Sequence, residues 1–223
     1  HPDMIRRQME IITSAQVEIV ITAHQEINER QLPTDVYVED AIELLDRKEV
    51  IRRLIEDQDI QSYFWGKLYK AEIIKKLRFP EDYTYEDTAM LAEILMSTDC
   101  IAYSKSVYYF YYMNPNSILH SRDLRLNLQQ LRAYEKQMQD IVTVYPEFQA
   151  MLELRHFRLE LSTYCYYLKQ YVGDAQYTVA LQKVWREMSA RKKSMAKAQI
   201  KLLPAEHLRF LRCRMQRILR HVS

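Results

Sequence analysis

Residues 65–88 read WGKLYKAEIIKKLRFPEDYTYEDT and hold the densest set of unusual features in this 223-residue chain. They begin with a tryptophan and one of only two glycines in the protein. An Arg-Phe-Pro break follows at residues 78–80, where proline interrupts regular backbone hydrogen bonding. The acidic pair Glu86-Asp87 comes next. We interpret this stretch as the segment around which the N-terminal half is organised.

The segments on either side of this stretch are typical of strands. Residues 17–27 (VEIVITAHQEI) are mostly apolar and β-branched, which predicts a strand buried on both faces inside an α/β sheet. His24 and Glu26 stand toward its C-terminal end, where open α/β sheets bind ligands, although a lone histidine there is more often structural. Residues 101–112 (IAYSKSVYYFYY) predict a second strand.

Helical spacing of apolar residues predicts helices over residues 3–14, 39–55 and 86–96. Thr84, three residues before Asp87, resembles a capping box, so the Glu86-Asp87 pair has a structural explanation as a helix start. A carboxylate held at a helix N-terminus is also rigidly aimed, as a general base must be, but the helix end is expected to lower its pKa. The two roles are compatible.

Trp65 and Lys67 also have two explanations. They can belong to a helix over residues 61–75 that buries Trp65 and leaves lysines in water. Alternatively, the flat face of Trp65 stacks on a sugar ring while Lys67 contacts a phosphate or a hydroxyl. The pair Asn116-Ser117 is a plain turn or a set of polar groups at the edge of a cleft.

After residue 121 the pattern becomes purely helical, with apolar residues at steps of three and four and breaks at Pro146 and Gly173. The sequence therefore predicts a helix-rich α/β protein. Residues 1–122 contain the sheet, and residues 123–223 form an α-helical C-terminal region.

Composition excludes several kinds of site. With 2 glycines the chain has no GxGxxG and no Walker A loop. Its three cysteines are isolated, so neither a zinc site nor a disulfide framework is predicted, and a reducing cytosol is the default setting. No apolar run reaches ~18 residues. The chain opens His1-Pro2-Asp3, which we interpret as a cut inside a longer protein.

The charge is unevenly distributed. Residues 181–223 hold 12 Lys and Arg against 2 acidic residues, a local charge of +10, whereas residues 1–180 carry −8. The basic tail therefore predicts an anionic partner. Its last helix is amphipathic and rich in arginine, which suits an anionic membrane surface as well as simple packing on its own domain. A nucleic-acid motif is lacking.

Five motifs occur together in order: WGKLYK at 65–70, RFPE at 78–81, Glu86-Asp87, a tyrosine stretch at 108–112 and NSI at 116–118. In this order and spacing they resemble the C-terminal half of family 2 glycosyltransferases of the GT-A fold, bacterial enzymes of surface polysaccharide assembly. The start also resembles that family. Residues 2–4 and the strand at 17–24 match the segments that follow its Asp-x-Asp motif, so the donor-nucleotide half is expected to be absent.

The resemblance implies an inverting transfer of a sugar from a nucleotide-diphosphate sugar to an acceptor hydroxyl. It assigns Asp87 as the general base. Residues expected to contact substrate are Glu86, Trp65, Lys67, Asn116, Ser117 and His24. A divalent metal, Mn or Mg, belongs to the intact enzyme, and no cofactor is expected in this chain. His120 corresponds to a late metal-binding or diphosphate-binding histidine of some GT-A enzymes.

We therefore expect the acceptor-side part of a glycosyltransferase of capsule-type polysaccharide synthesis, inactive by itself, with a partial GT-A sheet. Its partners would be a nucleotide sugar and a glycan or lipid-linked acceptor, without nucleic acid. It would be cytoplasmic, with peripheral contact to the inner membrane face. The alternative is a non-enzymatic helical adaptor that binds a protein, an anionic membrane or nucleic acid through residues 181–223.

Overall fold

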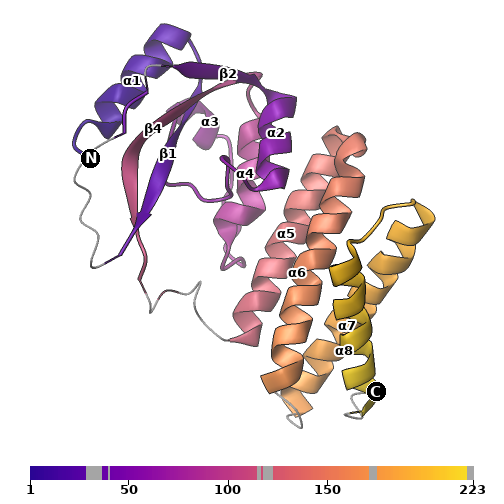
Figure 1. The fold of residues 1–223 in the computed structure, drawn as a ribbon. Coiled ribbons are helices and arrows are strands. Elements are labelled where there is room, and N and C mark those ends of the chain that lie inside the picture. The colour runs from indigo at the N-terminus through magenta and orange to yellow at the C-terminus, as the bar shows by residue number, and fades with distance from the viewer. Residues whose placement is uncertain (29–36, 40, 115–116, 118–122, 171–174, 220–223) are drawn as a thin grey trace. The chain divides into compact units, whose positions relative to one another are not determined.

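The computed structural model describes residues 1–28, 37–39, 41–114, 117, 123–170 and 175–219. The chain divides into two compact units, His1–Ser121 and Arg122–Ser223 (Figure 1). The first unit holds a small sheet with helices, and the second is built from helices among its described residues. The predicted helix-rich α/β class is thus confirmed.

The sheet of the first unit has four strands in the order β2-β4-β1-β3. They are β1 (Ile19–Ile27), β2 (Ile42–Asp46), β3 (Lys67–Tyr69) and β4 (Cys100–Tyr112). The central strands β1 and β4 are parallel, whereas each edge strand runs antiparallel to its neighbour. Both predicted strands, over 17–27 and 101–112, are therefore present and lie side by side at the centre.

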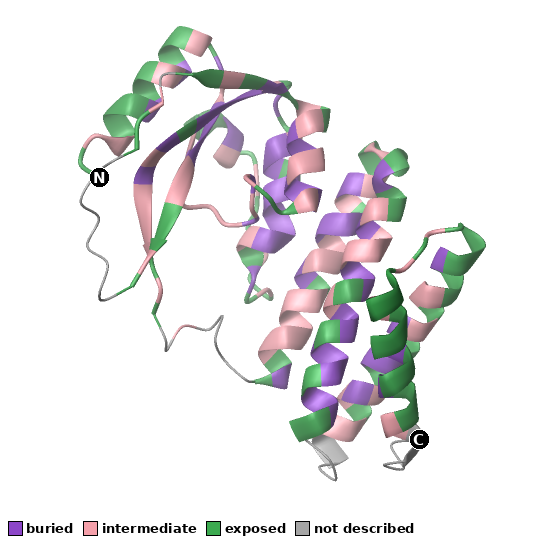
Figure 2. Ribbon diagram, viewed as in Figure 1, coloured by how far each residue is buried: buried purple, intermediate pink, exposed green. Residues whose placement is uncertain are grey.

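Helices α1 (Met4–Ala15), α2 (Arg47–Glu56), α3 (Ala71–Ile74) and α4 (Glu86–Met96) accompany the sheet. Ile19, Val20 and Ile21 in β1 are 0–2% exposed. Because successive strand residues point to opposite faces, both faces of β1 are covered here, as predicted. On one face Val20 packs with Ile12 of α1, and α2 and α4 lie on the other side of the sheet (Figure 1). Within the first unit, Figure 2 shows buried residues in the central strands and in α2 and α4.

Three local predictions are wrong. Residues 39–55 do not form one helix, because β2 pairs with β4 over Ile42–Asp46 and α2 begins only at Arg47. Residues 61–75 are not one helix either; β3 pairs with β1, and a four-residue helix follows. In both places strand pairing overrides a local helical pattern. The capping box is also absent: Tyr85 is the N-cap of α4 and makes no side-chain cap, so Thr84 lies outside the helix.

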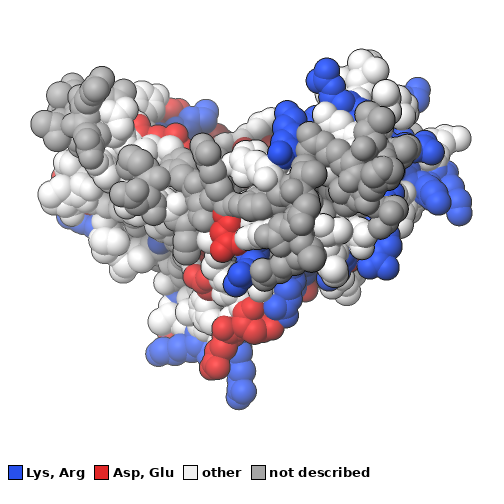
Figure 3. Space-filling model, turned by 90° about the horizontal axis from the view of Figure 1, so that it is seen from below, with Lys and Arg blue, Asp and Glu red and all other residues white. Residues whose placement is uncertain are grey.

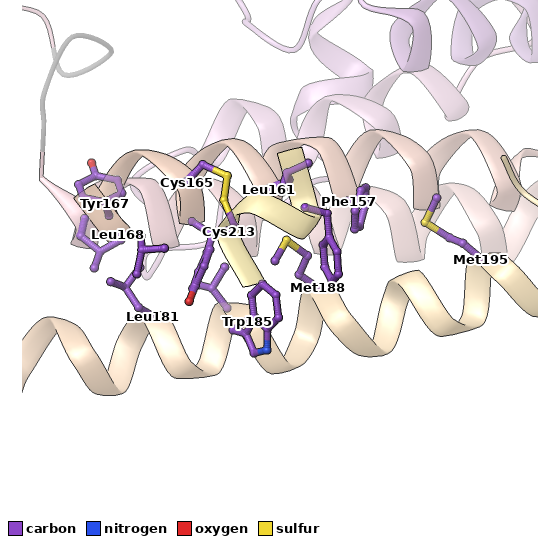
Figure 4. Close-up of a cluster of buried hydrophobic side chains, with 14 residues drawn as sticks. Phe157, Leu161, Cys165, Tyr167, Leu168, Leu181, Trp185, Met188, Met195 and Cys213 are labelled. Carbon is purple, nitrogen blue, oxygen red and sulfur yellow. A yellow bond between two sulfur atoms is a disulfide. The ribbon is translucent and has the colours of Figure 1, made fainter. Parts of the chain in front are cut away.

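The second unit contains α5 (Leu124–Val144), a short 3₁₀ turn at Pro146–Phe148, α6 (Gln149–Gln170), α7 (Ala175–Lys197) and α8 (Pro204–Leu219). These are the helices that the apolar spacing predicted. Figure 4 shows their shared core, in which Phe157 and Leu161 of α6 meet Trp185 and Met188 of α7. The core is contiguous from α6 to α8.

A disulfide links Cys165 of α6 to Cys213 of α8, with Cα atoms 6.1 Å apart (Figure 4). The isolated cysteines implied no disulfide framework, so this bridge was not predicted from the sequence. The 48-residue separation hid the pair, since neither cysteine stands in a local motif. Cys100, in the first unit, is free.

A partly buried ionic network lies between α5, α6 and α7. The guanidinium of Arg191 donates to Glu153 at 2.6 Å, to Glu135 at 2.8 Å and to Glu160 at 3.2 Å. Burial raises the pKa of Glu160 to about 7 and lowers that of His156, whose ring faces the same carboxylates, to about 3. Arg191 is thus the main counter-charge for Glu160, which is 2% exposed.

None of the described helices is both long enough and apolar enough to cross a membrane.

Candidate functional site

The candidate site of the first unit is built on the C-terminal halves of the two central strands. In the parallel ladder between β1 and β4, His24 is paired with Tyr109 and Glu26 with Tyr111. Register shifts around Ala23 separate this half from the regular N-terminal half of the pairing. Such irregularities re-aim side chains, and this part of the sheet is less buried than the part that precedes it.

Five rings from three segments meet here, and we call them the aromatic cluster: His24, Tyr63, Trp65, Tyr109 and Tyr111. Tyr63 stacks on Trp65 with ring centroids 3.4 Å apart and planes 6° from parallel. Tyr109 and Tyr111 also stack on the indole, at 4.7 and 4.9 Å. His24 meets Trp65 edge-on at 4.9 Å. All five are partly exposed, and three tyrosine rings cover the indole of Trp65, so the cluster is a stacked group of rings with partly exposed edges.

A single glycine sets the geometry of the segment that carries Trp65. Gly66 has φ +72°, a conformation that residues with a Cβ rarely adopt. Its carbonyl oxygen accepts hydrogen bonds from the amide and hydroxyl of Thr22, at 3.1 and 3.0 Å, and from the Gln8 side chain at 3.2 Å. These hydrogen bonds to β1 and α1 fix the backbone at Gly66. They thereby fix the directions in which the neighbouring residues Trp65 and Lys67 extend.

Lys67 is buried and holds the backbone of the segment that carries Tyr63 and Trp65. Its ammonium group donates to the carbonyl oxygens of Tyr63, at 2.6 Å, and Gln61, at 3.1 Å, and the residue is 8% exposed. Burial lowers the pKa of Lys67 to about 7, and the nearby charge of Asp87 opposes that shift. Lys67 therefore holds residues 61–67 in place, and its amine is committed to the backbone.

Asp87 lies in the first turn of α4, half-buried, whereas Glu86 is exposed. One carboxylate oxygen of Asp87 accepts a 2.6 Å hydrogen bond from the Thr88 amide. The pKa of Asp87 is raised, chiefly by burial and against the opposing effects of Thr88 and Lys67. The expectation that the helix end lowers this pKa is therefore wrong, because loss of hydration outweighs the free N–H groups.

Tyr69, the last residue of β3, also interacts electrostatically with Asp87. Its hydroxyl points at the Phe64 carbonyl at 3.5 Å, and burial together with the charge of Asp87 raises its pKa. The negative charge of Asp87 thus affects both residues. It opposes the lowering of the Lys67 pKa and contributes to the raised pKa of Tyr69. Burial thus makes Asp87 a stronger base than a free aspartate, and the charge of Lys67 partly opposes that shift.

His24 has a partner that its sequence position did not reveal. The hydroxyl of Tyr63 lies 3.1 Å from Nδ1 and 3.2 Å from Nε2 of His24 and also contacts Gln61 Oε1. Burial lowers the pKa of His24, with a smaller opposing effect of Glu26. A neutral His24 at pH 7 can therefore exchange hydrogen bonds with Tyr63 or with a bound hydroxyl.

The structure brings His24, Trp65 and Lys67 together and connects Lys67 to Asp87 electrostatically. Ser117 is partly buried, and its amide donates to the Asn114 carbonyl at 3.0 Å. Asn116 and His120 lie outside the described residues.

Sequence reasoning missed three members of the aromatic cluster and the glutamine beneath it. Tyr109 and Tyr111 belong to the strand predicted over 101–112, where their spacing of two places them on one face. Tyr63 gave no such signal, because its stacking depends on the irregular backbone of residues 61–66. Gln8 is an isolated polar residue in α1, and only its burial in the structure distinguishes it from the other polar residues of that helix.

The described residues hold no group of three or more His, Cys, Asp and Glu side chains arranged to bind a metal ion. An Asp-x-Asp pattern does occur at Asp57-Gln58-Asp59, but it closes α2. Asp57 is the left-handed C-cap of the helix, and Asp59 pairs with Arg53 at 2.9 Å. These aspartates serve the helix end and do not fit the metal motif that the resemblance implies.

No protein-family model matches the chain. A search of curated proteins likewise finds no match.

Proposed function

We propose that the first unit is the acceptor side of a sugar-transferring enzyme, with Asp87 as the general base. One observation carries the proposal: a half-buried carboxylate with a raised pKa lies in the first turn of α4, within electrostatic reach of the buried Lys67. Perturbed carboxylates of this kind are frequent in active sites. The ordered sequence motifs around Asp87 supply the reaction class.

In this proposal Asp87 takes the proton from an acceptor hydroxyl as its oxygen attacks the anomeric carbon of a donor sugar. The bond between that carbon and the diphosphate breaks, and the nucleoside diphosphate leaves with the electron pair. Attack opposite the leaving group inverts the anomeric centre. A base works best when its pKa approaches the working pH, which burial of Asp87 favours.

The aromatic cluster provides the acceptor surface. Sugar rings present apolar C–H faces that pack well on aromatic rings, and their hydroxyls need polar partners at the edges. His24 and the hydroxyl of Tyr63 supply such partners. We assign Lys67 a positioning role, because its ammonium is already bonded to two carbonyl oxygens. Since the described residues offer no fitting metal ligands, no step here uses the metal.

Ligand binding can be tested with Trp65 as the reporter in the W185F variant, which removes the other tryptophan. Methyl glycosides of glucose, galactose and N-acetylglucosamine are titrated, and the matching UDP sugars are added separately. We expect at least one glycoside to change Trp65 emission and the UDP sugars alone to have no effect. The Y109A variant should abolish the response. Sugar transfer by these 223 residues alone, or glycosides that leave emission unchanged at millimolar concentration, would contradict the proposal.

A further inference from the structure

The second unit contains a groove that the proposed sugar chemistry does not use. It lies between the end of α7, residues 200–204 and α8, and has a volume of about 1140 Å³. Apolar side chains line much of it: Trp185, Met195, Ile200, Leu202 and Phe210. A groove of this size accommodates a drug-sized or larger apolar group.

Cations surround this apolar lining. Lys192, Lys193, Lys201, Arg214 and Arg217 all contribute to the groove, and no acidic residue is among its described lining. The Lys192 amine lies 4.3 Å over the Phe210 ring, and Arg217 lies 5.4 Å from the Trp185 ring. The buried Nε of Arg217 has no hydrogen-bond partner among the described residues. Positive charge therefore gathers here without an acidic counterpart in the groove.

An exposed apolar stripe on α8 continues from the groove. Leu208, which lines the groove, is 66% exposed, and Met215 is 63% exposed. With Leu211 between them, their spacing of three and four places them on one side of the helix, opposite the buried Phe210 and Cys213. Arg212 flanks the stripe and is exposed. Figure 3 shows Lys and Arg side chains gathered on the side of the view where the helical unit lies.

We propose that the groove binds an anionic phospholipid of a bilayer, with the phosphate between the basic side chains and part of the acyl chain against the apolar lining. The α8 stripe then lies on the same membrane surface. Charge complementarity favours an anionic headgroup, and the apolar lining with exposed leucines favours a lipid over a nucleic acid. This inference does not depend on the sugar-transfer proposal.

The test is vesicle co-sedimentation with phosphatidylcholine alone and with added phosphatidylglycerol. We expect binding only with phosphatidylglycerol, and about 30-fold weaker binding for K201Q/R214Q, since each basic residue near the surface contributes ~1 kcal/mol. The control K183Q/R186Q changes two exposed α7 residues that do not line the groove, and should bind within a few-fold of the native chain. Circular dichroism melting curves show whether each variant is folded.

Occupation of the groove is tested by quenching of Trp185 in the W65F variant with brominated-chain phosphatidylglycerol. We expect quenching by the brominated lipid and no loss of binding on addition of inorganic phosphate. Equal binding to both vesicle types, no quenching of Trp185, full competition by inorganic phosphate, or tighter binding to single-stranded DNA than to vesicles would each overturn the proposal.

Discussion

The ammonium group of Lys67 donates a 2.6 Å hydrogen bond to the carbonyl oxygen of Tyr63 and lies 4.5 Å from the centre of the same tyrosine ring. One side chain thereby fixes both the backbone and the ring of a residue that stacks on Trp65. The same ammonium is attracted by Asp87. Lys67 thus contacts the aromatic cluster directly and interacts with the proposed base electrostatically.

The buried amine of Lys67 should make stability depend on pH. Its pKa is about 7 in the folded chain against 10.5 when exposed, so between these values the unfolded chain holds a proton that the folded chain lacks. Raising the pH from 7 to 10 should therefore increase the free energy of unfolding through this group, by up to ~1.4 kcal/mol per pH unit. Urea unfolding of native chain and K67M across this range measures the difference. K67M should lose this slope, whereas K70M, at an exposed lysine, should keep it. Identical slopes in all three chains would rule the effect out.

Substitution of Gly66 should separate backbone strain from steric conflict. A Cβ at Gly66 would lie 3.7 Å from the Thr22 carbonyl oxygen, an ordinary contact, so the φ of +72° is the obstacle. G66A should lower the free energy of unfolding by about 1–2 kcal/mol, and G66N should cost less because asparagine tolerates positive φ. Chemical unfolding compares the variants. Equal losses for both would show that space, not φ, limits this position.

Removal of Arg191 should strongly destabilise the helical unit. R191M leaves Glu160 buried without its main cation, which typically costs about 3–5 kcal/mol. R186M changes an exposed arginine of the same helix and should have little effect. Thermal unfolding followed by circular dichroism provides the comparison. If R191M melts like R186M, the network contributes no net stability.

The Cys165–Cys213 disulfide should be detectable by thiol counting. Under denaturing conditions without reductant, one thiol, that of Cys100, should react, and three should react after reduction. The bridge closes a long loop, so C165S/C213S should be about 2–4 kcal/mol less stable than C100S. Three reactive thiols in the unreduced protein would contradict the pairing.

The elements that the sequence predicted correctly are those in which the spacing of apolar residues agrees with the faces that are buried. The two central strands are apolar on both faces, and the long helices carry a regular apolar stripe, so local pattern and tertiary packing agree. It failed at β2 and β3, where edge strands of three to five residues take their conformation from pairing with β1 and β4. Short strands carry too little pattern to compete with a helical spacing.

The candidate site was predicted only in part for a similar reason. Asp87, Trp65 and His24 stand out by residue type and position. Tyr63 and Gln8 do not, because they act through Gly66 and through a segment without regular structure. The direction of the Asp87 pKa shift also depends on burial. Burial cannot be read from the position of Asp87 at the start of a helix, which alone predicts a lowered pKa.

The central claim is that Asp87 is the base of a sugar transfer, and turnover of the D87N variant tests it most directly. The measurement uses a protein that contains this chain together with a donor-nucleotide half, and E93Q serves as the control because Glu93 is an exposed residue of the same helix, α4. We expect D87N to lower kcat by at least ~100-fold while donor binding stays unchanged, as loss of a general base does. A kcat for D87N close to that of the unmodified protein would show that Asp87 only begins a helix.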